Sequence, residues 1–359
     1  TAERFDRLGS RYWGRWGRLV HNGTAWMQVA MLISMALAAA SVPAGDPLRL
    51  QIPIECDLPG GCVVQNYVDT GARSAARDFT CHRLTYEGHG GTDFRVIHPS
   101  DYADGVPVLA AAAGTVRAIR NDMPDGEPGR SPTEDIAGRE AGNAVVIRHG
   151  EQWETQYSHL RRGSVRVRPG AEVERGTVLG TVGLSGRTEF PHLHFAVRRD
   201  GDSLDPFTGQ LEGSGCDTAR TPLWRKTARE RLSYRAGGVL RTGFLDRPPR
   251  DDALRGYAES RRAWLADAEA IVFWIKVFGA RPGDVLELEL HGPEGELVAE
   301  GRHRFERHKA NYFMFTGQRR GERPRWPEGT YEGSYRWTRA GASAPHASGR
   351  IRMHMAGDD

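Results

Sequence analysis

The sequence predicts a mainly β protein in which two antiparallel β domains are joined by a linker. Short runs of β-branched and small residues recur through most of the chain. Glycine or proline interrupts them every ~8–12 residues, which is typical of antiparallel sheets and sandwiches. The composition, 39% hydrophobic and 26% charged, is that of a soluble globular protein. With 359 residues the chain is long enough for two domains with cores of ordinary size.

Residues 1–44 have the order of a bacterial export signal. Arg11, Arg15 and Arg18 precede an apolar run, Met27 to Ala40, and small residues that suit cleavage follow it. The run is shorter than the ~20 residues that span a bilayer. We therefore expect an exported protein of the periplasm or cell envelope, with no stable membrane span after processing. The alternative is an uncleaved anchor.

Residues 45–83 read as an extended N-terminal arm with a short strand or two, because they are rich in Gly, Pro and Asp. The four cysteines of the chain fit an oxidising compartment and allow three disulfide connectivities. Cys56 and Cys62 bracket a turn-rich loop, so Cys56–Cys62 with Cys81–Cys216 is the most economical pairing. The net charge of +3 is small and the charges are interspersed, which argues against a nucleic-acid partner.

Residues 84–208 are the first β domain. Short β-rich runs fill it, and one insertion, Asp122 to Gly142, carries three prolines and is expected to be an exposed loop. The expected strands lie within Val106–Ile119, Asn143–His149, Thr155–Leu160, Val165–Val173 and Thr177–Val182.

Residues 209–265 change character and are interpreted as a linker with a short helix, because Arg-rich segments and the Pro248-Pro249 break replace the strands. Residues 266–359 return to alternating strands, with a hairpin signal at His291-Gly-Pro-Glu-Gly, and predict a small immunoglobulin-like β-sandwich. The run Ala268 to Val277 is apolar enough for a core or an interface, and the core is the preferred interpretation. The alternative is that this domain binds a protein partner. No cluster of titratable groups marks a chemical site in it.

A candidate site begins at Pro191-His-Leu-His-Phe195. Residues two apart in a strand point to the same face, so His192 and His194 project together while Leu193 and Phe195 face the opposite side. Two imidazoles side by side suit metal binding or acid–base chemistry, although structural His-x-His pairs also occur.

A second segment, Gly88-His-Gly-Gly-Thr-Asp93, supplies a histidine and a carboxylate. In a straight strand His89 and Asp93 would lie ~13 Å apart, too far to share one ion bound at ~2 Å. Gly90 and Gly91 instead allow a sharp bend that brings His89 back towards Asp93. A third segment, Gln156 to Leu160, places His159 at the end of a strand.

These segments, in this order and spacing, resemble the lysostaphin-like or LytM-type zinc metallopeptidases (peptidase family M twenty-three) over roughly residues 84–208. The resemblance also includes Gly105-Val-Pro-Val-x-Ala110, Ala113-Gly-Thr-Val116, Gly142-Asn143, Tyr157-x-His159-Leu160, Gly176-x-x-x-Gly180, Gly183-x-x-Gly186 and Asp205-Pro206.

The resemblance implies that His89, Asp93 and His194 bind one Zn²⁺ per chain and leave one coordination position open, as in catalytic zinc sites. It also implies that His159 and His192 take the proton from the attacking water and stabilise the oxyanion, roles that suit histidine near neutral pH. Which of the two is the base is left open by the sequence.

The sequence departs from the family pattern at Arg187-Thr-Glu-Phe-Pro191, where many relatives carry small residues. Glu189 could reach the cleft, but a salt bridge at its rim is the preferred interpretation. Asn143 could position substrate or serve a turn. The remaining histidines fit no motif and are expected to have structural or solvated roles: His82, His98, His149, His291, His303, His308, His346 and His354.

The function implied by the resemblance is hydrolysis of peptide bonds in the stem or cross-link of peptidoglycan. A D,D-carboxypeptidase of the related zinc group ranks lower, because that group spaces its first His and Asp more widely. The alternative from another class is a non-catalytic LytM-like protein that binds murein or activates an amidase. The presence of all five site residues disfavours that alternative.

Overall fold

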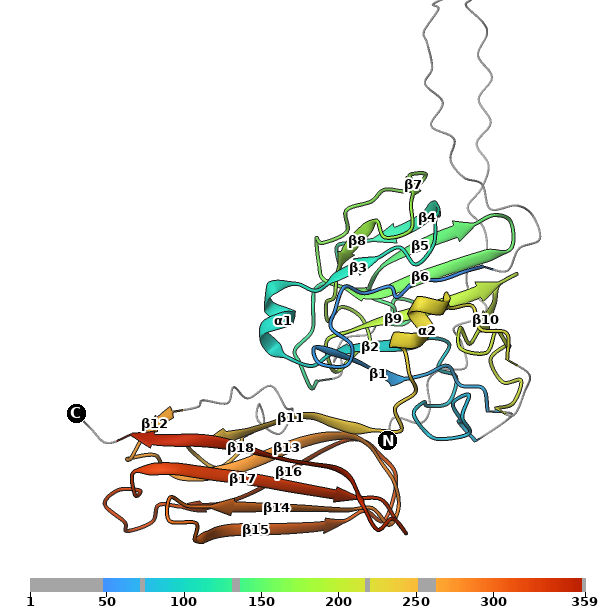
Figure 1. Cartoon of the computed structure of the whole chain (residues 1–359). Helices are drawn as coiled ribbons and strands as arrows, with labels where there is room; N and C mark the ends of the chain where they lie inside the picture. The colour runs from blue at the N-terminus through green and yellow to red at the C-terminus, as the bar shows by residue number, and fades with distance from the viewer. Residues whose placement is uncertain (1–47, 72–74, 131–135, 217–219, 251–262, 357–359) are drawn as a thin grey trace, which may run out of the picture.

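The computed structural model describes residues 48–71, 75–130, 136–216, 220–250 and 263–356 (Figure 1). The expected export signal in residues 1–44 lies outside these ranges. Within them, no helix has the length and apolar character needed to cross a bilayer. The regular secondary structure of the described residues is almost wholly β-strand, with two six-residue helices, which confirms the mainly β prediction.

The N-terminal domain contains an eight-stranded antiparallel sheet in the order β1-β2-β9-β6-β5-β4-β7, with β10 paired to β9. Two more strands, β3 and β8, form a small antiparallel sheet beside it. The strands are β1 (Cys62–Asn66), β2 (Thr92–Val96), β3 (Pro107–Leu109), β4 (Gly114–Arg120), β5 (Asn143–His149), β6 (Trp153–Leu160), β7 (Glu172–Val173), β8 (Val178–Thr181), β9 (His192–Arg199) and β10 (Asp202–Leu204).

Two short helices flank this sheet. Helix α1 (Pro99–Asp104) follows β2, and it begins with a proline and carries Asp101 in its first turn, both of which favour a helix N-terminus. Helix α2 (Lys226–Arg231) lies in the region predicted to be a linker, where a short helix is expected.

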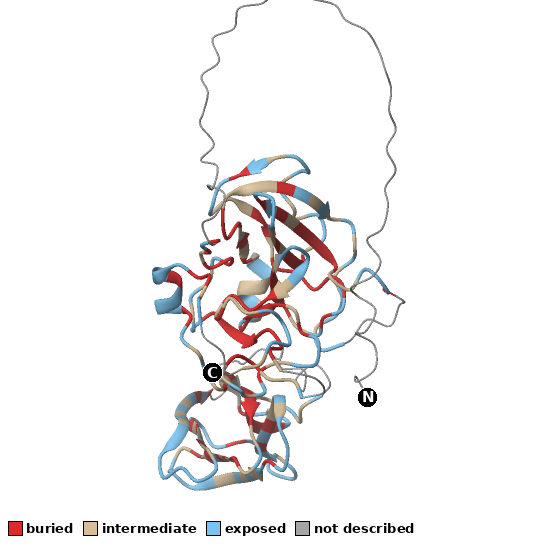
Figure 2. Cartoon of the chain, turned by 90° about the vertical axis from the view of Figure 1, so that its right-hand side faces the viewer, coloured by how far each residue is buried: buried red, intermediate tan, exposed pale blue. Residues whose placement is uncertain are grey.

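One face of the large sheet packs on the hydrophobic core. Phe94 of β2, Tyr157 of β6 and Phe195 of β9 are each fully buried there, and the ring of Trp224 lies 5.7 Å from that of Phe195. Leu50 of the arm pairs with Trp224 through a parallel β-bridge. Figure 2 shows this buried layer in the centre of the domain. Because side chains alternate along a strand, the opposite face of β2 and β9 is left for polar groups.

The C-terminal domain consists of two packed sheets, of order β11-β13-β16 and β12-β18-β17-β14-β15. All pairs are antiparallel except β12 with β18. The strands are β11 (Gly238–Leu245), β12 (Ala263–Leu265), β13 (Ala270–Ala280), β14 (Val285–His291), β15 (Leu297–Arg304), β16 (Lys309–Arg319), β17 (Gly329–Thr338) and β18 (Pro345–Ala356).

Strand β11 lies inside the range predicted to be a linker. Its pairing with β13 is interrupted by a bulge between Val239 and Arg241, and only Leu240, Gly243 and Phe244 of its eight residues are buried. The alternation that identifies a strand is therefore weak in the sequence. The core interpretation of Ala268 to Val277 agrees with the structure, because Ile271, Phe273, Ile275 and Val277 are buried in the core cluster of the C-terminal domain. A protein partner for this domain stays a prediction.

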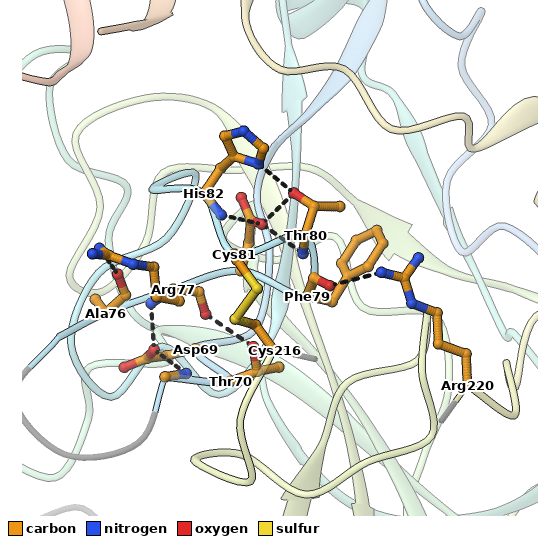
Figure 3. The surroundings of a disulfide bond; sticks show 12 residues. Asp69, Thr70, Ala76, Arg77, Phe79, Thr80, Cys81, His82, Cys216 and Arg220 are labelled. Atoms are coloured by element: carbon orange, nitrogen blue, oxygen red, sulfur yellow. Dashed lines mark hydrogen bonds between the residues drawn. A yellow bond between two sulfur atoms is a disulfide. The ribbon is translucent and has the colours of Figure 1, made fainter. Parts of the chain in front are cut away.

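Both disulfides have the expected pairing, Cys56–Cys62 and Cys81–Cys216. The second joins the N-terminal arm to the segment after β10, and Figure 3 shows it beside the hydrogen-bonded turns around Asp69 and Thr80. Its two cysteines are 135 positions apart, whereas the first pair is separated by only six.

Because the closed loop is so much longer, we expect Cys81–Cys216 to contribute more to stability. The chain-entropy model gives about 5 kcal/mol for this loop and about 2 kcal/mol for the short one. The double variant Cys81→Ser/Cys216→Ser should therefore lose more free energy of unfolding in urea than the matched control Cys56→Ser/Cys62→Ser. An equal or smaller loss would contradict the prediction.

Candidate metal centre

Strands β2 and β9 bring two of the predicted ligands together. In their antiparallel register Asp93 is directly opposite His194, and Arg95 is opposite His192. All four side chains lie on the face turned away from the core, because Phe94 and Leu193 between them are fully buried on the other face. The Nδ1 atom of His194 lies 2.9 Å from Oδ1 of Asp93.

His89 joins them through a bend at Gly91, where the absence of a side chain makes room for the His194 ring. Its Nε2 atom lies 3.1 Å from Oδ1 of Asp93 and 3.2 Å from Nδ1 of His194. The ring is 1% exposed and its Nδ1 atom donates to the carbonyl of Tyr67 at 2.7 Å. A neutral His89 therefore presents its Nε2 lone pair to the carboxylate of Asp93.

This arrangement fits a cation. Ligand atoms of one tetrahedral zinc ion, bound at ~2.0–2.1 Å, lie about 3.3 Å from one another. The three distances among His89 Nε2, Asp93 Oδ1 and His194 Nδ1 are 2.9–3.2 Å. Converging lone pairs repel one another unless a proton or a cation lies among them, so the buried donor set suits a divalent metal.

Asp93 is ionised in this setting. Its burial would raise the pKa of the carboxyl, but His89 and His192 outweigh that effect and hold the pKa well below its usual value. Asn66 of β1 lies opposite Asp93 and donates from Nδ2 to Oδ2 at 2.9 Å, which leaves Oδ1 to face the histidines. Burial lowers the pKa of His89, yet the Asp93 carboxylate reverses that effect and the net shift is upward.

His159 and His192 lie on one side of this group. Their ring centroids are 4.7 Å apart, and the ring of His159 is 5.9 Å from that of His194. The Nδ1 atom of His159 donates to the Ser185 carbonyl at 2.8 Å, and that of His192 donates to the Phe190 carbonyl at 2.9 Å. Both rings thus keep their Nε2 lone pairs for the site, and His192 Nε2 lies 3.4 Å from Asp93 Oδ1.

The backbone of His159 has a φ of 62°, in the left-handed region that few non-glycine residues adopt. Hydrogen bonds hold it there, because its N–H donates to the Ala141 carbonyl and its own carbonyl accepts from Gly183, both at 2.9 Å. Burial, followed by the neighbouring His192 and His194, keeps the pKa of His159 well below its usual value. His159 is therefore neutral near pH 7 and able to accept a proton.

All five predicted site residues are thus brought into one cluster. Two sets could hold a metal among the described residues: His89, Asp93 and His194, or His159, His192 and His194. None of the other histidines in the described chain belongs to either set. His149, for example, is buried and bonded to Ala113 and Thr155.

Asn143 has a structural role. It is fully buried, and its amide contacts backbone groups of Met123 and Leu160. It therefore ties the start of the Asp122–Gly142 insertion to the end of β6. Sequence reasoning missed Asn66 and the carbonyls that orient the rings. No motif marks Asn66, and a backbone carbonyl leaves no trace in residue identity.

A family model for Peptidase family M23 matches residues 87–206. Residues 87–206 form a peptidase family M23 domain. The "Uncharacterized metalloprotease" of Haemophilus influenzae is 31% identical over 144 residues, which are 40% of this chain and 26% of that protein. The "Peptidoglycan DD-endopeptidase ShyA" of Vibrio cholerae is 35% identical over 109 residues, 30% of this chain and 20% of that protein.

Among solved structures, a zinc containing peptidase from Vibrio cholerae is 26% identical to the chain, with a TM-score of 0.26. The aligned region covers 40% of this chain and 39% of the Vibrio cholerae chain. The present chain thus spans about a quarter or less of the two curated relatives, and the M23 match is confined to the N-terminal domain.

The close approach of Gly91 to His194 gives a test of the M23 site. A Cβ atom on Gly91 would lie 2.5 Å from Nε2 of His194 and 2.9 Å from the Phe195 carbonyl oxygen, so Gly91→Ala must displace the ring or the strand. On Gly90 it would meet only the ends of Ser203 and Glu212, at 3.0 and 3.2 Å. We expect Gly91→Ala to weaken the affinity for a divalent metal ion at least about tenfold, and Gly90→Ala to change that affinity little. Competition with a chromophoric chelator measures both, and equal affinities would refute this geometry.

Proposed function

We propose that the N-terminal domain is a zinc-dependent endopeptidase that hydrolyses peptide bonds in peptidoglycan. The observation that carries the proposal is the convergence of His89 Nε2, Asp93 Oδ1 and His194 Nδ1, with two further imidazoles on one side of them. The M23 match and the printed name of the Vibrio cholerae relative support the substrate class.

In this proposal His89, Asp93 and His194 hold one zinc ion per chain. A zinc ion bound there would polarise a carbonyl and activate water near neutral pH. Two neutral imidazoles and one carboxylate leave the ion with a net positive charge, and three protein ligands leave a coordination position open.

The remaining histidines move the proton and stabilise charge. His159 is neutral, and the Ser185 carbonyl orients its ring, so its Nε2 atom can take a proton from the attacking water and return it to the leaving amine. His192, held by Phe190, can donate from Nε2 to the developing oxyanion once it is protonated. The opposite assignment, with His192 as the base and His159 at the oxyanion, uses the same atoms. The next experiment distinguishes proton transfer from metal binding, and it does not assign the two roles.

The proposed location is the cell envelope. The basic and apolar order of residues 1–44 and the two disulfides support export. Peptidoglycan would then be the macromolecular partner of the domain.

Single substitutions should separate metal binding from proton transfer. We expect His194→Ala to lose both bound zinc and activity. His159→Ala should keep zinc at one equivalent but release new amino groups from purified sacculi at least about 100-fold more slowly, because general acid–base catalysis contributes on this scale. His308→Ala, a histidine of the C-terminal domain, is the control. Zinc is measured by elemental analysis.

The outcomes distinguish the alternatives. Full zinc occupancy in the wild type without release of amines from any type of sacculus would contradict the enzyme and favour a non-catalytic murein-binding regulator. Unchanged activity in His194→Ala would contradict the ligand assignment.

A further inference from the structure

The C-terminal domain reaches the candidate site through one buried guanidinium. Arg95 lies on β2, two residues after Asp93 on the same face, and is only 4% exposed. Its Nη1 atom donates to Oε1 of Gln65 and to Oδ1 of Asn311, both at 2.6 Å. Asn311 belongs to β16 of the C-terminal domain. A buried cation needs hydrogen-bond acceptors in place of water, and here each domain supplies one acceptor to the guanidinium of Arg95.

The same guanidinium covers the residue that orients His192. Its Cζ atom lies 4.3 Å from the centroid of the Phe190 ring, a cation–π contact. The Phe190 carbonyl accepts from Nδ1 of His192 at 2.9 Å and from the Thr188 hydroxyl at 2.8 Å. The rings of Phe190 and His192 are 4.8 Å apart. Phe190 is therefore held between Arg95 and His192.

Positive charge crowds this junction. Lys276 of β13 is 8% exposed, and burial together with the nearby Arg95 and Arg241 lowers its pKa to about 7, while Glu189 opposes that shift. Glu189, the residue that departs from the family pattern, thus lies within electrostatic range of the C-terminal domain. Removal of the Asn311 oxygen would leave the guanidinium of Arg95 with one fewer hydrogen-bond acceptor.

We propose that the C-terminal domain completes the catalytic site, with Asn311 and Arg95 acting as positioning residues for His192. Asn311 fixes the guanidinium of Arg95, the guanidinium fixes Phe190, and the Phe190 carbonyl fixes the tautomer and orientation of the His192 ring. A contact that served only to join the domains would affect stability and leave His192 unchanged. The expected change in kcat rests on the proposed function. The expected change in the tautomer of His192 can be measured without any enzymatic activity.

The test uses the full chain loaded with zinc and four substitutions. Asn311→Ala removes the acceptor, whereas Asn311→Asp keeps one. Thr316→Ala on the same strand is the control, because odd and even positions of β16 face opposite sides and Thr316 is buried next to Gly301. Phe190→Leu, which keeps the carbonyl but removes the ring beneath Arg95, is a second route to the same effect.

Long-range ¹H–¹⁵N spectra of the histidine rings report the first result. In the wild type and in Asn311→Asp, His192 should show one tautomer with the proton on Nδ1. In Asn311→Ala and Phe190→Leu its signals should shift towards a mixture of tautomers, with zinc occupancy unchanged. This result is independent of any enzymatic activity, so it still decides the inference if the proposed function is wrong.

Kinetics on sacculi report the second result. We expect kcat to fall about tenfold in Asn311→Ala and Phe190→Leu with little change in KM, because a misplaced group costs rate rather than binding. Asn311→Asp should stay within about twofold of the wild type, like Thr316→Ala. Wild-type His192 signals in both Asn311→Ala and Phe190→Leu would overturn the proposal, as would a wild-type kcat in an active enzyme.

Discussion

The antiparallel register of β2 and β9 is the constraint on which the rest of the structure depends. It sets Asp93 opposite His194, and it sends Phe94 and Leu193 into the core. Because side chains alternate in a strand, a slip of one residue would turn the Asp93 carboxylate into the apolar core and the Phe94 ring towards the histidines. The hydrophobic core and the candidate metal centre are therefore specified by the same pattern. Packing of Trp224 on Phe195 supports the centre from behind, since any movement of that layer would also move His194.

The carbonyl groups of three separate segments orient the histidines. Tyr67 of the arm faces His89, Ser185 faces His159, and Phe190 faces His192. Each carbonyl accepts from Nδ1, so each ring presents Nε2 to the same small volume. The arm and the loops around β9 are thus parts of the site although they contribute few side chains to it. Through Arg95 and Asn311 this dependence extends to the second domain.

The sequence predicts the chemically active side chains of the site better than the residues and backbone contacts that hold them in place. The His-x-His spacing places His192 and His194 on one face, and the glycines after His89 permit a bend towards Asp93. The joining of these segments with His159 into one cluster follows only from the resemblance to the family. Asn66 could not, because its partner is 27 positions away and no pattern links them. The left-handed backbone of His159 depends on contacts with Ala141 and Gly183 that only the folded chain creates. The sequence predicts a linker where β11 lies, because Arg-rich segments and the Pro248-Pro249 break dominate that region. The pairing of β11 with β13 is seen only in the folded chain. The immunoglobulin-like character of the C-terminal domain stays a prediction.

Anomalous X-ray diffraction at the zinc edge, from crystals of the zinc-loaded protein, locates the bound metal directly. We expect one peak per chain, about 2.0–2.2 Å from Nε2 of His89, Oδ1 of Asp93 and Nδ1 of His194. A peak among His159, His192 and His194, the other set that could hold a metal, would contradict it. So would zinc bound only at other positions, with His89 and Asp93 joined by a proton.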